Sequence, residues 1–219
     1  MIVLKSPSCQ PQFNSDLEKH LLERRGQDFL LFYINRPSVI VGRNQSVDAE
    51  INIDYCEANG IEIFRRISGG GAVYHDFGNI NYAFAVDKGS GAALDRDFLG
   101  PVIRVLQSFG VEAVAGARRE LLAGNKKISG TASLVTRDRI LFHGTLLHRV
   151  DMTHLHSSLQ TVRAGFGNSV RSKYVPSIPS EVMNLSAITG ETETTEAFLE
   201  RIIFLCGNRL QYISSESLL

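Results

Sequence analysis

The segment Arg65-Arg66-Ile67-Ser68-Gly69-Gly70-Gly71 holds the densest set of residues that could do chemistry. Three consecutive glycines remove every Cβ atom, which permits positive φ and lets a ligand lie against backbone N–H groups. The two arginines before them can offer fixed positive charge to a phosphate or a carboxylate. The flanking pattern favours an anion-binding loop over the alternative, a flexible turn with solvated arginines. It is not a P-loop, because the Gly-x-x-x-x-Gly-Lys-Ser/Thr spacing is absent.

Two other segments carry candidate chemical groups. In Lys126-Lys127-Ile128-Ser129-Gly130, a lysine followed by small residues can point its ammonium into a pocket and stabilise charge that develops there. Taken alone, an exposed lysine at the start of a hairpin explains this segment better. His143, beside Gly144 on an apolar strand, can face a ligand cavity, although such a histidine is more often a satisfied core residue.

Other enzyme classes find little support in the sequence. There is no Gly-x-Ser-x-Gly elbow and no His-Glu-x-x-His metal motif. A hydrolase built from Ser68, His75 and Asp76 is a poor hypothesis, because adjacent residues on a strand point to opposite faces. Cys56 has no neighbour that would lower its thiol pKa, so we interpret it as structural.

Composition limits the partners and the location. The 219 residues include 43% hydrophobic and 21% charged residues, and the formal net charge is zero. No global field would attract nucleic acid or an anionic membrane, and no apolar run approaches a membrane span of about 20 residues. The odd number of cysteines argues against a disulfide framework. We therefore expect a cytoplasmic protein without nucleic-acid or membrane partners.

The elements that must position these groups can be read from periodicity and turn residues. Ser15 and Glu18 form a capping-box pattern that predicts a helix over 15–25. Further helices are expected at 54–59, 95–109 and 195–210. Strands are expected at 29–34, 38–42, 61–66, 72–75, 80–86 and 111–114, with an antiparallel pair at 127–133 and 140–147. The stretch 165–180 is expected to be a mobile loop. Because regular βαβ alternation is absent, the pattern favours an α+β fold with a mixed, largely antiparallel sheet.

Taken in order, these segments resemble the lipoate–protein ligase family. The resemblance covers about residues 14–185, and the block 65–82, Arg-Arg-Ile-Ser-Gly-Gly-Gly-Ala-Val-Tyr-His-Asp-Phe-Gly-Asn-Ile-Asn-Tyr, is its most specific part. The shorter matching blocks are 42–45, 127–132, 143–147, 170–172 and 184–185. The resemblance implies the catalytic fold shared by biotin and lipoate ligases, a mixed sheet flanked by helices.

The resemblance also implies roles for individual residues. Lys127 would be the catalytic residue, touching both the lipoate carboxylate and the α-phosphate of ATP. The nucleotide would be bound by Arg66, by the backbone of Gly71, Ala72, Val73 and Tyr74, and by Lys127. Lipoate would be bound by Ser68, Gly69, Gly70, His75, Asn79, Gly130, His143 and Gly144. Mg²⁺ would bridge ATP oxygens. Arg118-Arg119-Glu120 stands where the family commonly has Arg-Asn-Asp, so Glu120 is a possible metal ligand.

The implied reaction is ATP-dependent formation of lipoyl-AMP, followed by transfer of the lipoyl group to a lysine of an acceptor lipoyl domain. Expected acceptors are of the 2-oxoacid dehydrogenase E2 or glycine cleavage H protein type. The alternative is a lipoyl or octanoyl transferase of the same fold that uses preformed lipoyl-AMP or an acyl-carrier thioester. The stretch 111–125 lacks the cysteine of the thioester-forming transferases, which favours a ligase. A non-catalytic lipoate or nucleotide binder is a third reading, disfavoured by Lys127 and the glycine loop.

The expected domain organisation is a single catalytic domain over residues 1–219. The longer ligases carry a C-terminal accessory domain, and about thirty-five residues after Asn184 are too few for a second core. We therefore expect no accessory domain within this chain. A separate accessory-domain protein is accordingly a candidate partner for the adenylation step.

Overall fold

A six-stranded mixed sheet forms the centre of the computed structural model, which describes residues 1–89, 96–159, 175–207 and 210–212. Its strand order is β10-β11-β6-β2-β1-β12. The strands are β1 (Ile2–Lys5), β2 (Phe29–Tyr33), β6 (Asn79–Asp87), β10 (Thr131–Val135), β11 (Arg139–Leu147) and β12 (Leu210–Tyr212). β1 is parallel to β2 and β12, and the other pairs are antiparallel. The central strands β6 and β11 are buried almost throughout, because both faces of the sheet are covered.

Two three-stranded sheets flank the central one. The first, in the order β4-β3-β5, consists of β3 (Ser38–Val41), β4 (Glu62–Arg65) and β5 (Val73–His75). The second, in the order β7-β8-β9, consists of β7 (Ala113–Ala115), β8 (Leu121–Ala123) and β9 (Lys126–Ser129). Since β4 and β5 pair with opposite edges of β3, the glycine-rich segment 66–72 must cross the end of β3 to join them.

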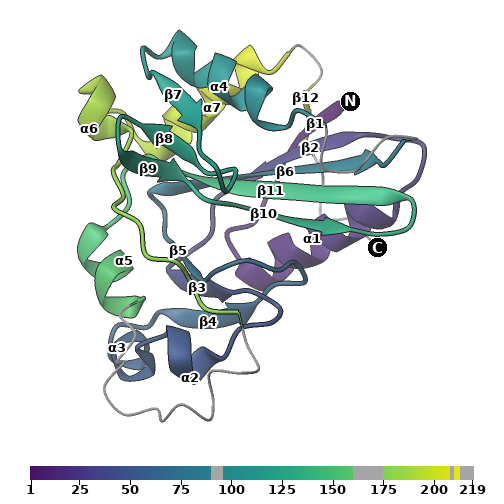
Figure 1. Cartoon of the computed structure of the whole chain (residues 1–219). Helices are drawn as coiled ribbons and strands as arrows, with labels where there is room; N and C mark the ends of the chain where they lie inside the picture. The colour runs from purple at the N-terminus through teal and green to yellow at the C-terminus, as the bar shows by residue number, and fades with distance from the viewer. Residues whose placement is uncertain (90–95, 160–174, 208–209, 213–219) are drawn as a thin grey trace.

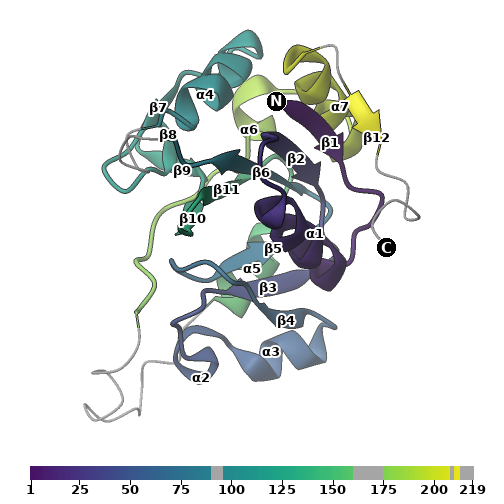
Figure 2. The ribbon, with the colours of Figure 1, turned by 90° about the vertical axis from the view of Figure 1, so that its right-hand side faces the viewer.

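The helices cover the sheet from two sides (Figures 1 and 2). On one side lie α4 (Leu99–Ser108), α6 (Ser186–Thr189) and α7 (Thr195–Leu205), over the largest apolar cluster. On the other side lie α1 (Pro11–Glu23) and the small sheet β4-β3-β5 with α2 (Val47–Glu50), α3 (Ile53–Ala58) and α5 (Met152–Ser158). The glycine-rich segment therefore belongs to the α1 side of the central sheet.

The capping box predicted at Ser15 is wrong. The helix begins at Pro11, after Gln10, which makes no side-chain cap hydrogen bond, and it ends at Glu23. Proline is well suited to the first helical turn, because its missing N–H would have no partner there and its φ is already helical. Glu18 consequently lies inside the helix and is buried against the sheet.

The strand predicted over 127–133 is two strands that belong to different sheets. β9 pairs with β8, whereas β10 pairs with β11, and the chain changes sheets at Gly130. There the N–H of Gly130 donates to Oγ1 of Thr145 at 3.0 Å, and the N–H of Thr145 donates to the carbonyl of Gly130 at 3.0 Å. The predicted pairing with β11 therefore holds only from Thr131 onward.

The predicted fold class is confirmed, since the sheets are mixed and mainly antiparallel with helices on both faces. The closing helix ends at Leu205, five residues before the predicted end. The mobile loop expected at 165–180 falls outside the described residues as far as position 174, as does the block 170–172. In the described part of the chain, no helix has both the length and the apolarity to cross a membrane.

Candidate functional site

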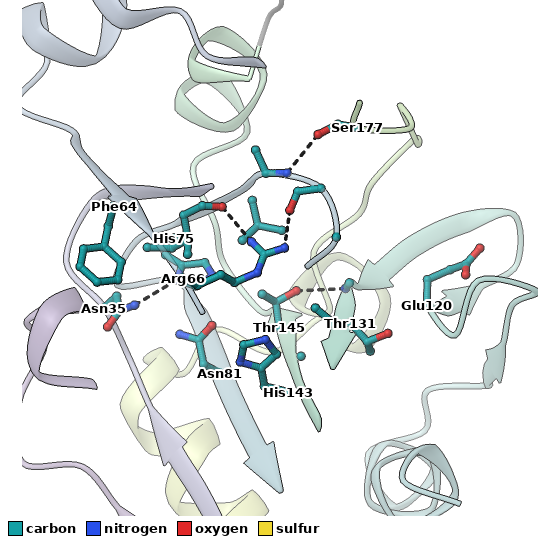
Figure 3. A pocket seen from close by; sticks show the side chains of 18 of the residues that line it. Asn35, Phe64, Arg66, His75, Asn81, Glu120, Thr131, His143, Thr145 and Ser177 are labelled. Carbon is teal, nitrogen blue, oxygen red and sulfur yellow. Dashed lines mark hydrogen bonds between the residues drawn. The ribbon is translucent and has the colours of Figure 1, made fainter. Parts of the chain in front are cut away.

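A cavity of about 300 Å³ lies between α1 and the central sheet on one side and the glycine-rich segment on the other (Figure 3). Asn35 and Phe64 lie at one end, and Thr131 and Glu120 at the other. Most residues predicted for the site line it, namely Arg66, Gly70, Gly71, Ala72, Val73, His75, Glu120, Lys127, Gly130, His143 and Gly144. The first and last of these predicted residues, Arg66 and Gly144, are seventy-eight positions apart in the sequence, and the fold brings them to one cavity.

Four predicted ligand contacts, Ser68, Gly69, Tyr74 and Asn79, do not line this cavity. The hydroxyl of Ser68 is turned toward Arg66 and His143. Tyr74 is buried on the other side of its strand, with its ring 6.3 Å from that of His154. Asn79 is fully buried and donates to Oδ1 of Asn81 at 3.0 Å. In this structure the side chains of Ser68, Tyr74 and Asn79 are therefore directed away from the cavity.

Arg66 holds the glycine-rich segment in shape. Its guanidinium donates to the carbonyl of Ile40 at 3.0 Å and to the carbonyls of Gly69 and Gly71 at 2.6 and 2.7 Å. The residue is 8% exposed, and burial lowers its pKa to about 10, which leaves it cationic at neutral pH. A buried cation that satisfies several carbonyls at once fixes a loop whose glycines have no side chains to hold it.

Two glycines in this region are required by geometry. Gly70 has φ +85°, a conformation that side chains other than glycine rarely adopt. A Cβ atom on Gly42 would lie 2.1 Å from the carbonyl oxygen of Gly70, so the two backbones meet directly. The Gly-Arg-Asn-Gln block at 42–45 therefore packs directly against the backbone of the glycine-rich segment.

Behind Arg66, a chain of buried hydrogen bonds runs across the cavity floor. Oγ of Ser68 accepts from Nε of Arg66 at 3.0 Å and lies 2.7 Å from Nε2 of His143. Nδ1 of His143 lies 2.9 Å from Glu18, which also accepts from the hydroxyl of Tyr33 at 2.9 Å. In the simplest hydrogen-bonding arrangement, the hydroxyl of Ser68 donates to Nε2 of His143, and Nδ1 of His143 donates to the carboxylate of Glu18. Burial, followed by the charge of Glu18, raises the pKa of Tyr33.

The order Ser68–His143–Glu18 is that of a hydrolase triad, but its environment argues against that chemistry. Ser68 is fully buried and does not line the cavity, so its hydroxyl has no access to a substrate. It already accepts a hydrogen bond from Arg66, which would lower its nucleophilicity. These hydrogen bonds instead connect α1 and β11 to the glycine-rich segment. His143 is therefore both a buried residue with hydrogen-bond partners and part of the cavity lining.

His75 presents a donor at the cavity. The amide of Asn35 accepts from Nδ2 of Asn14 at 2.8 Å, so its own Nδ2 is the group that lies 3.0 Å from Nδ1 of His75. His75 Nδ1 must therefore accept, and the proton sits on Nε2. Among the described residues, Nε2 has no hydrogen-bond partner. Burial, reinforced by Arg66 and His143, lowers the pKa of His75 to about 3, so it is neutral at physiological pH.

Lys127 lies in β9 with its backbone fixed on both sides. Its N–H donates to the carbonyl of Glu181 at 2.8 Å, and its carbonyl accepts from the N–H of Met183 at 3.0 Å. Burial lowers the pKa of Lys127, Arg118 lowers it further, and Glu120 partly opposes both effects. The neighbouring Lys126 is exposed and does not line the cavity. The structure thus distinguishes two lysines that are adjacent in the sequence.

Glu120 is the carboxylate at the Lys127 end of the cavity. It accepts from the backbone N–H of Arg118 at 2.9 Å and is 9% exposed. In the residues that the structure describes, no group of three or more His, Cys, Asp or Glu side chains could hold a metal ion. A Mg²⁺ ion here would accordingly need its other ligands from substrate oxygens and water, which is its usual mode of binding to nucleotides.

Residues 175–178 form part of the cavity wall, although no local sequence pattern predicts this. Oγ of Ser177 accepts from the N–H of Ala72 at 3.0 Å and from Nε2 of Gln45 at 2.9 Å. The N–H of Ser177 donates to Glu50 at 3.0 Å. A ligand that binds the Ala72 N–H must therefore take the place of the Ser177 hydroxyl. The other lining residues outside the prediction include Glu18, Tyr33, Asn35, Phe64, Asn81, Arg118, Thr131 and Thr145.

The sequence of this chain is similar to those of known proteins. The sequence model of one protein family, described as the lipoyl protein ligase A/B catalytic domain, matches residues 10–204. The chain is 39% identical over 196 residues to lipoate-protein ligase LplJ of Bacillus subtilis, and 36% identical over 196 residues to lipoate–protein ligase 1 of Staphylococcus aureus. Each alignment covers 88% of this chain and 58% of the relative, so the chain spans less than two thirds of the length of these relatives. The mitochondrial lipoyl amidotransferase LIPT1 of Homo sapiens is 39% identical over 163 residues, 73% of this chain and 42% of the relative.

Solved structures agree on the fold. A lipoate-protein ligase A bound with ATP superposes with a TM-score of 0.77 at 24% identity, covering all of this chain and 92% of that one. LipL1 of P. falciparum in complex with lipoate superposes with a TM-score of 0.75 at 24% identity, covering 99% of this chain and 67% of that one. The arrangement of sheets and helices is therefore that of the lipoate ligase catalytic fold. On the extent of the family match and the identity to its members, this chain belongs to the lipoyl protein ligase A/B catalytic domain family.

Proposed function

We propose that the chain activates lipoate with ATP and passes the lipoyl group to a lysine of an acceptor protein. The observation that carries the proposal is the cavity itself, which joins a lysine to a glycine-rich loop and to a partly apolar chamber. Lys127, Gly71 and Ala72 line one part, and Ile40 and Phe64 line another. A ligand with a carboxylate on an apolar chain matches this division, and the ligases among the relatives support the assignment.

In the first step, a carboxylate oxygen of lipoate attacks the α-phosphorus of ATP. The bond from that phosphorus to the bridging oxygen breaks, and pyrophosphate leaves with the electron pair. The Lys127 ammonium reduces the repulsion between the two anions and stabilises the charge that develops on the α-phosphate oxygens. Arg66 acts indirectly, since its hydrogen bonds to Gly69 and Gly71 hold the loop against which the phosphates lie.

In the second step, the neutral amine of the acceptor lysine attacks the lipoyl carbonyl carbon. The carbon–oxygen bond to AMP breaks, AMP leaves as its phosphate anion, and the amine loses a proton as the amide forms. The same cationic surroundings stabilise the negative charge on the leaving AMP. Acceptors of this reaction are lipoyl domains of the 2-oxoacid dehydrogenase E2 or glycine cleavage H protein type.

Mg²⁺ suits the Lys127 end of this cavity. Glu120 supplies one buried carboxylate there, and triphosphate oxygens would complete the coordination, as Mg²⁺ commonly requires. When bound, the ion neutralises charge on the phosphates and on the departing pyrophosphate. The chain's own contribution is the backbone N–H of Arg118, which orients the Glu120 carboxylate.

A related transferase is the second candidate, favoured by the 39% identity to a lipoyl amidotransferase. Such an enzyme would start from preformed lipoyl-AMP or an acyl-carrier thioester. Attack on a thioester through an enzyme cysteine finds no support, because no cysteine occurs among the described residues that line the cavity.

The two candidates separate in parallel assays on the purified chain. One assay contains lipoate, ATP, Mg²⁺ and an isolated E2 lipoyl domain, and the other contains synthetic lipoyl-AMP and the same domain. Pyrophosphate release, with a matching lipoyl mass gain on the domain, is the expected result. Transfer from lipoyl-AMP without pyrophosphate release from ATP, by the chain alone and also after a separate accessory-domain protein is added, would favour the transferase. Failure of both assays would overturn the assignment of this site to lipoyl chemistry.

A further inference from the structure

A second hollow, of about 760 Å³, lies beside the cavity and has a different character. Its walls come from the C-terminal half of α1, the segment Arg65–Ile67 and the β10–β11 hairpin. Arg66 lines both the hollow and the cavity, so the two share a wall. We call it the basic groove. Its lining residues are Lys19, Leu22, Glu23, Arg25, Arg43, Arg65, Arg66, Ile67, Leu134, Thr136, Arg137, Asp138 and Arg139.

The basic groove concentrates positive charge in a protein whose formal net charge is zero. Seven of its lining residues are lysine or arginine and two are acidic, which leaves a formal excess of five positive charges. One of the acids, Asp138, is already paired with Arg25 at 2.7 Å. Five of the cations are exposed, namely Lys19, Arg25, Arg43, Arg65 and Arg137. A local excess of this kind attracts an acidic partner and orients its approach.

The shape of the groove is held from within. Nη1 of Arg65 donates to the carbonyls of Gly42 and Gln45, both at 2.8 Å. Arg139 is 2% exposed and donates to the carbonyls of Gln27 and Ala85 and to the carboxylate of Asp87. The wall is therefore ordered before any partner arrives, and a preformed surface loses less entropy on binding.

The floor of the groove indicates a protein as its occupant. Leu22, Ile67 and Leu134 form an aliphatic patch that the cations surround. An apolar centre within a polar rim is the usual anatomy of a protein interface. No aromatic residue occurs among the described lining residues, whereas sites for single-stranded nucleic acid rely on aromatic side chains that stack with bases.

We propose that the basic groove is the docking surface for the acceptor protein, which meets it with a surface rich in carboxylates near the target lysine. The inference rests on the proposed function and adds the chemistry of the partner. Because the groove and the cavity share Arg66, a partner seated in the groove lies next to the chamber that its lysine must reach. The acceptor must leave after every turnover, so its binding is weak, electrostatic and sensitive to salt.

The test reverses two groove charges that lie outside the cavity, in the double variant Lys19→Glu/Arg137→Glu. The control is Arg104→Glu, an exposed arginine on α4, on the opposite side of the central sheet. The probe is an isolated E2 lipoyl domain. Lipoyl-AMP formation is measured without the domain, and KM and kcat for lipoylation of the domain are measured at low and high salt.

In the double variant, we expect KM for the domain to rise about tenfold at low salt while kcat is unchanged, since rim charges act mainly on association. The rise should shrink at high salt, where exposed charges are screened. Lipoyl-AMP formation should match the wild type, which also shows that the variant is folded. The neutral variant Lys19→Gln/Arg137→Gln should give a smaller rise, and Arg104→Glu none.

Failure of the docking inference can be distinguished from failure of the proposed function. An active double variant with unchanged KM overturns the docking surface and leaves the proposed function intact. A wild-type chain that neither forms lipoyl-AMP nor transfers the lipoyl group overturns the proposed function, and the docking inference with it. If a short single-stranded oligonucleotide binds the wild type, the double variant loses that binding and KM for the domain is unchanged, the occupant is nucleic acid and the proposal is wrong.

Discussion

The side chain of Lys127 lies over Gly130, so that a Cβ atom at position 130 would be 3.1 Å from both Cε and Nζ of the lysine. Gly130 is in turn held by two hydrogen bonds to Thr145 of β11. The ammonium therefore rests on a point where the chain passes from one sheet to the next. The position of the proposed catalytic group depends on the absence of a side chain three residues away.

Gly130→Ala should therefore impair catalysis more than folding. Its φ is not in the left-handed region, so alanine is compatible with the backbone and stability should change by no more than about 1 kcal/mol. The added methyl group displaces the ammonium, and we expect the rate of lipoyl-AMP formation to fall about 10- to 100-fold. Single-turnover kinetics and a thermal melt measure the two effects. If Gly130→Ala forms lipoyl-AMP at the wild-type rate, catalysis does not depend on where the Lys127 ammonium lies over Gly130.

Gly70→Val should weaken lipoate binding. Its φ of +85° strains any branched residue by about 1–3 kcal/mol, and the new Cβ would lie 3.1 Å from Nη2 of Arg66. We expect lipoate affinity, measured by calorimetry, to fall at least about tenfold from the combined strain and clash. Gly69→Ala is the matched change, since a Cβ there meets no atom within 4 Å. Equal affinity in Gly70→Val and the wild type would mean that this loop does not contact the ligand.

The glycine-rich segment shows which part of the site the sequence could predict. Three adjacent glycines after two arginines are a local signal for a loop, and they lie in the connection between β4 and β5, where Gly70 and Gly71 line the cavity. The contact of Ser177 with Ala72 has no such signal, because 105 positions separate the two residues. The backbone contact of Gly42 with Gly70 is also non-local.

Glu18 shows how a local pattern can mislead. Three residues after Ser15, it matched a helix cap, but Pro11 starts the helix a turn earlier and the carboxylate meets Tyr33 and His143 instead. Pro11 is a local signal for the helix start, whereas the contacts of the Glu18 carboxylate depend on the packing of α1 on the sheet. The break at Gly130 was missed for a related reason, since a strand that changes sheets has the same alternation as one that does not.

Acid should destabilise the fold through His75. Its folded pKa of about 3 lies below the ordinary 6.5, so between these values the unfolded chain binds a proton that the folded chain does not. The free energy of unfolding must then fall as pH falls through this window, by roughly 3 kcal/mol between pH 7 and pH 4. His148, with a pKa lowered to about 4 by burial, adds an effect of the same sign.

Urea unfolding at several pH values measures the contribution of His75. His75→Gln should lose roughly 3 kcal/mol less than the wild type on acidification. His156→Gln, which changes an exposed histidine, should lose as much as the wild type. The same loss in His75→Gln and the wild type would contradict a neutral, buried His75.

Lys127 is the residue proposed to activate lipoate at this cavity, and a comparison with the adjacent lysine tests its role. Lys127 lines the cavity, whereas Lys126 is exposed outside it. The measurement is single-turnover formation of lipoyl-AMP from lipoate and ATP by Lys127→Ala, Lys126→Ala and the wild type. We predict a loss of about 10²- to 10³-fold in Lys127→Ala, the usual cost of removing one electrostatic contact to a transition state, and no loss in Lys126→Ala. Lipoyl-AMP formation by Lys127→Ala at the wild-type rate would contradict the account.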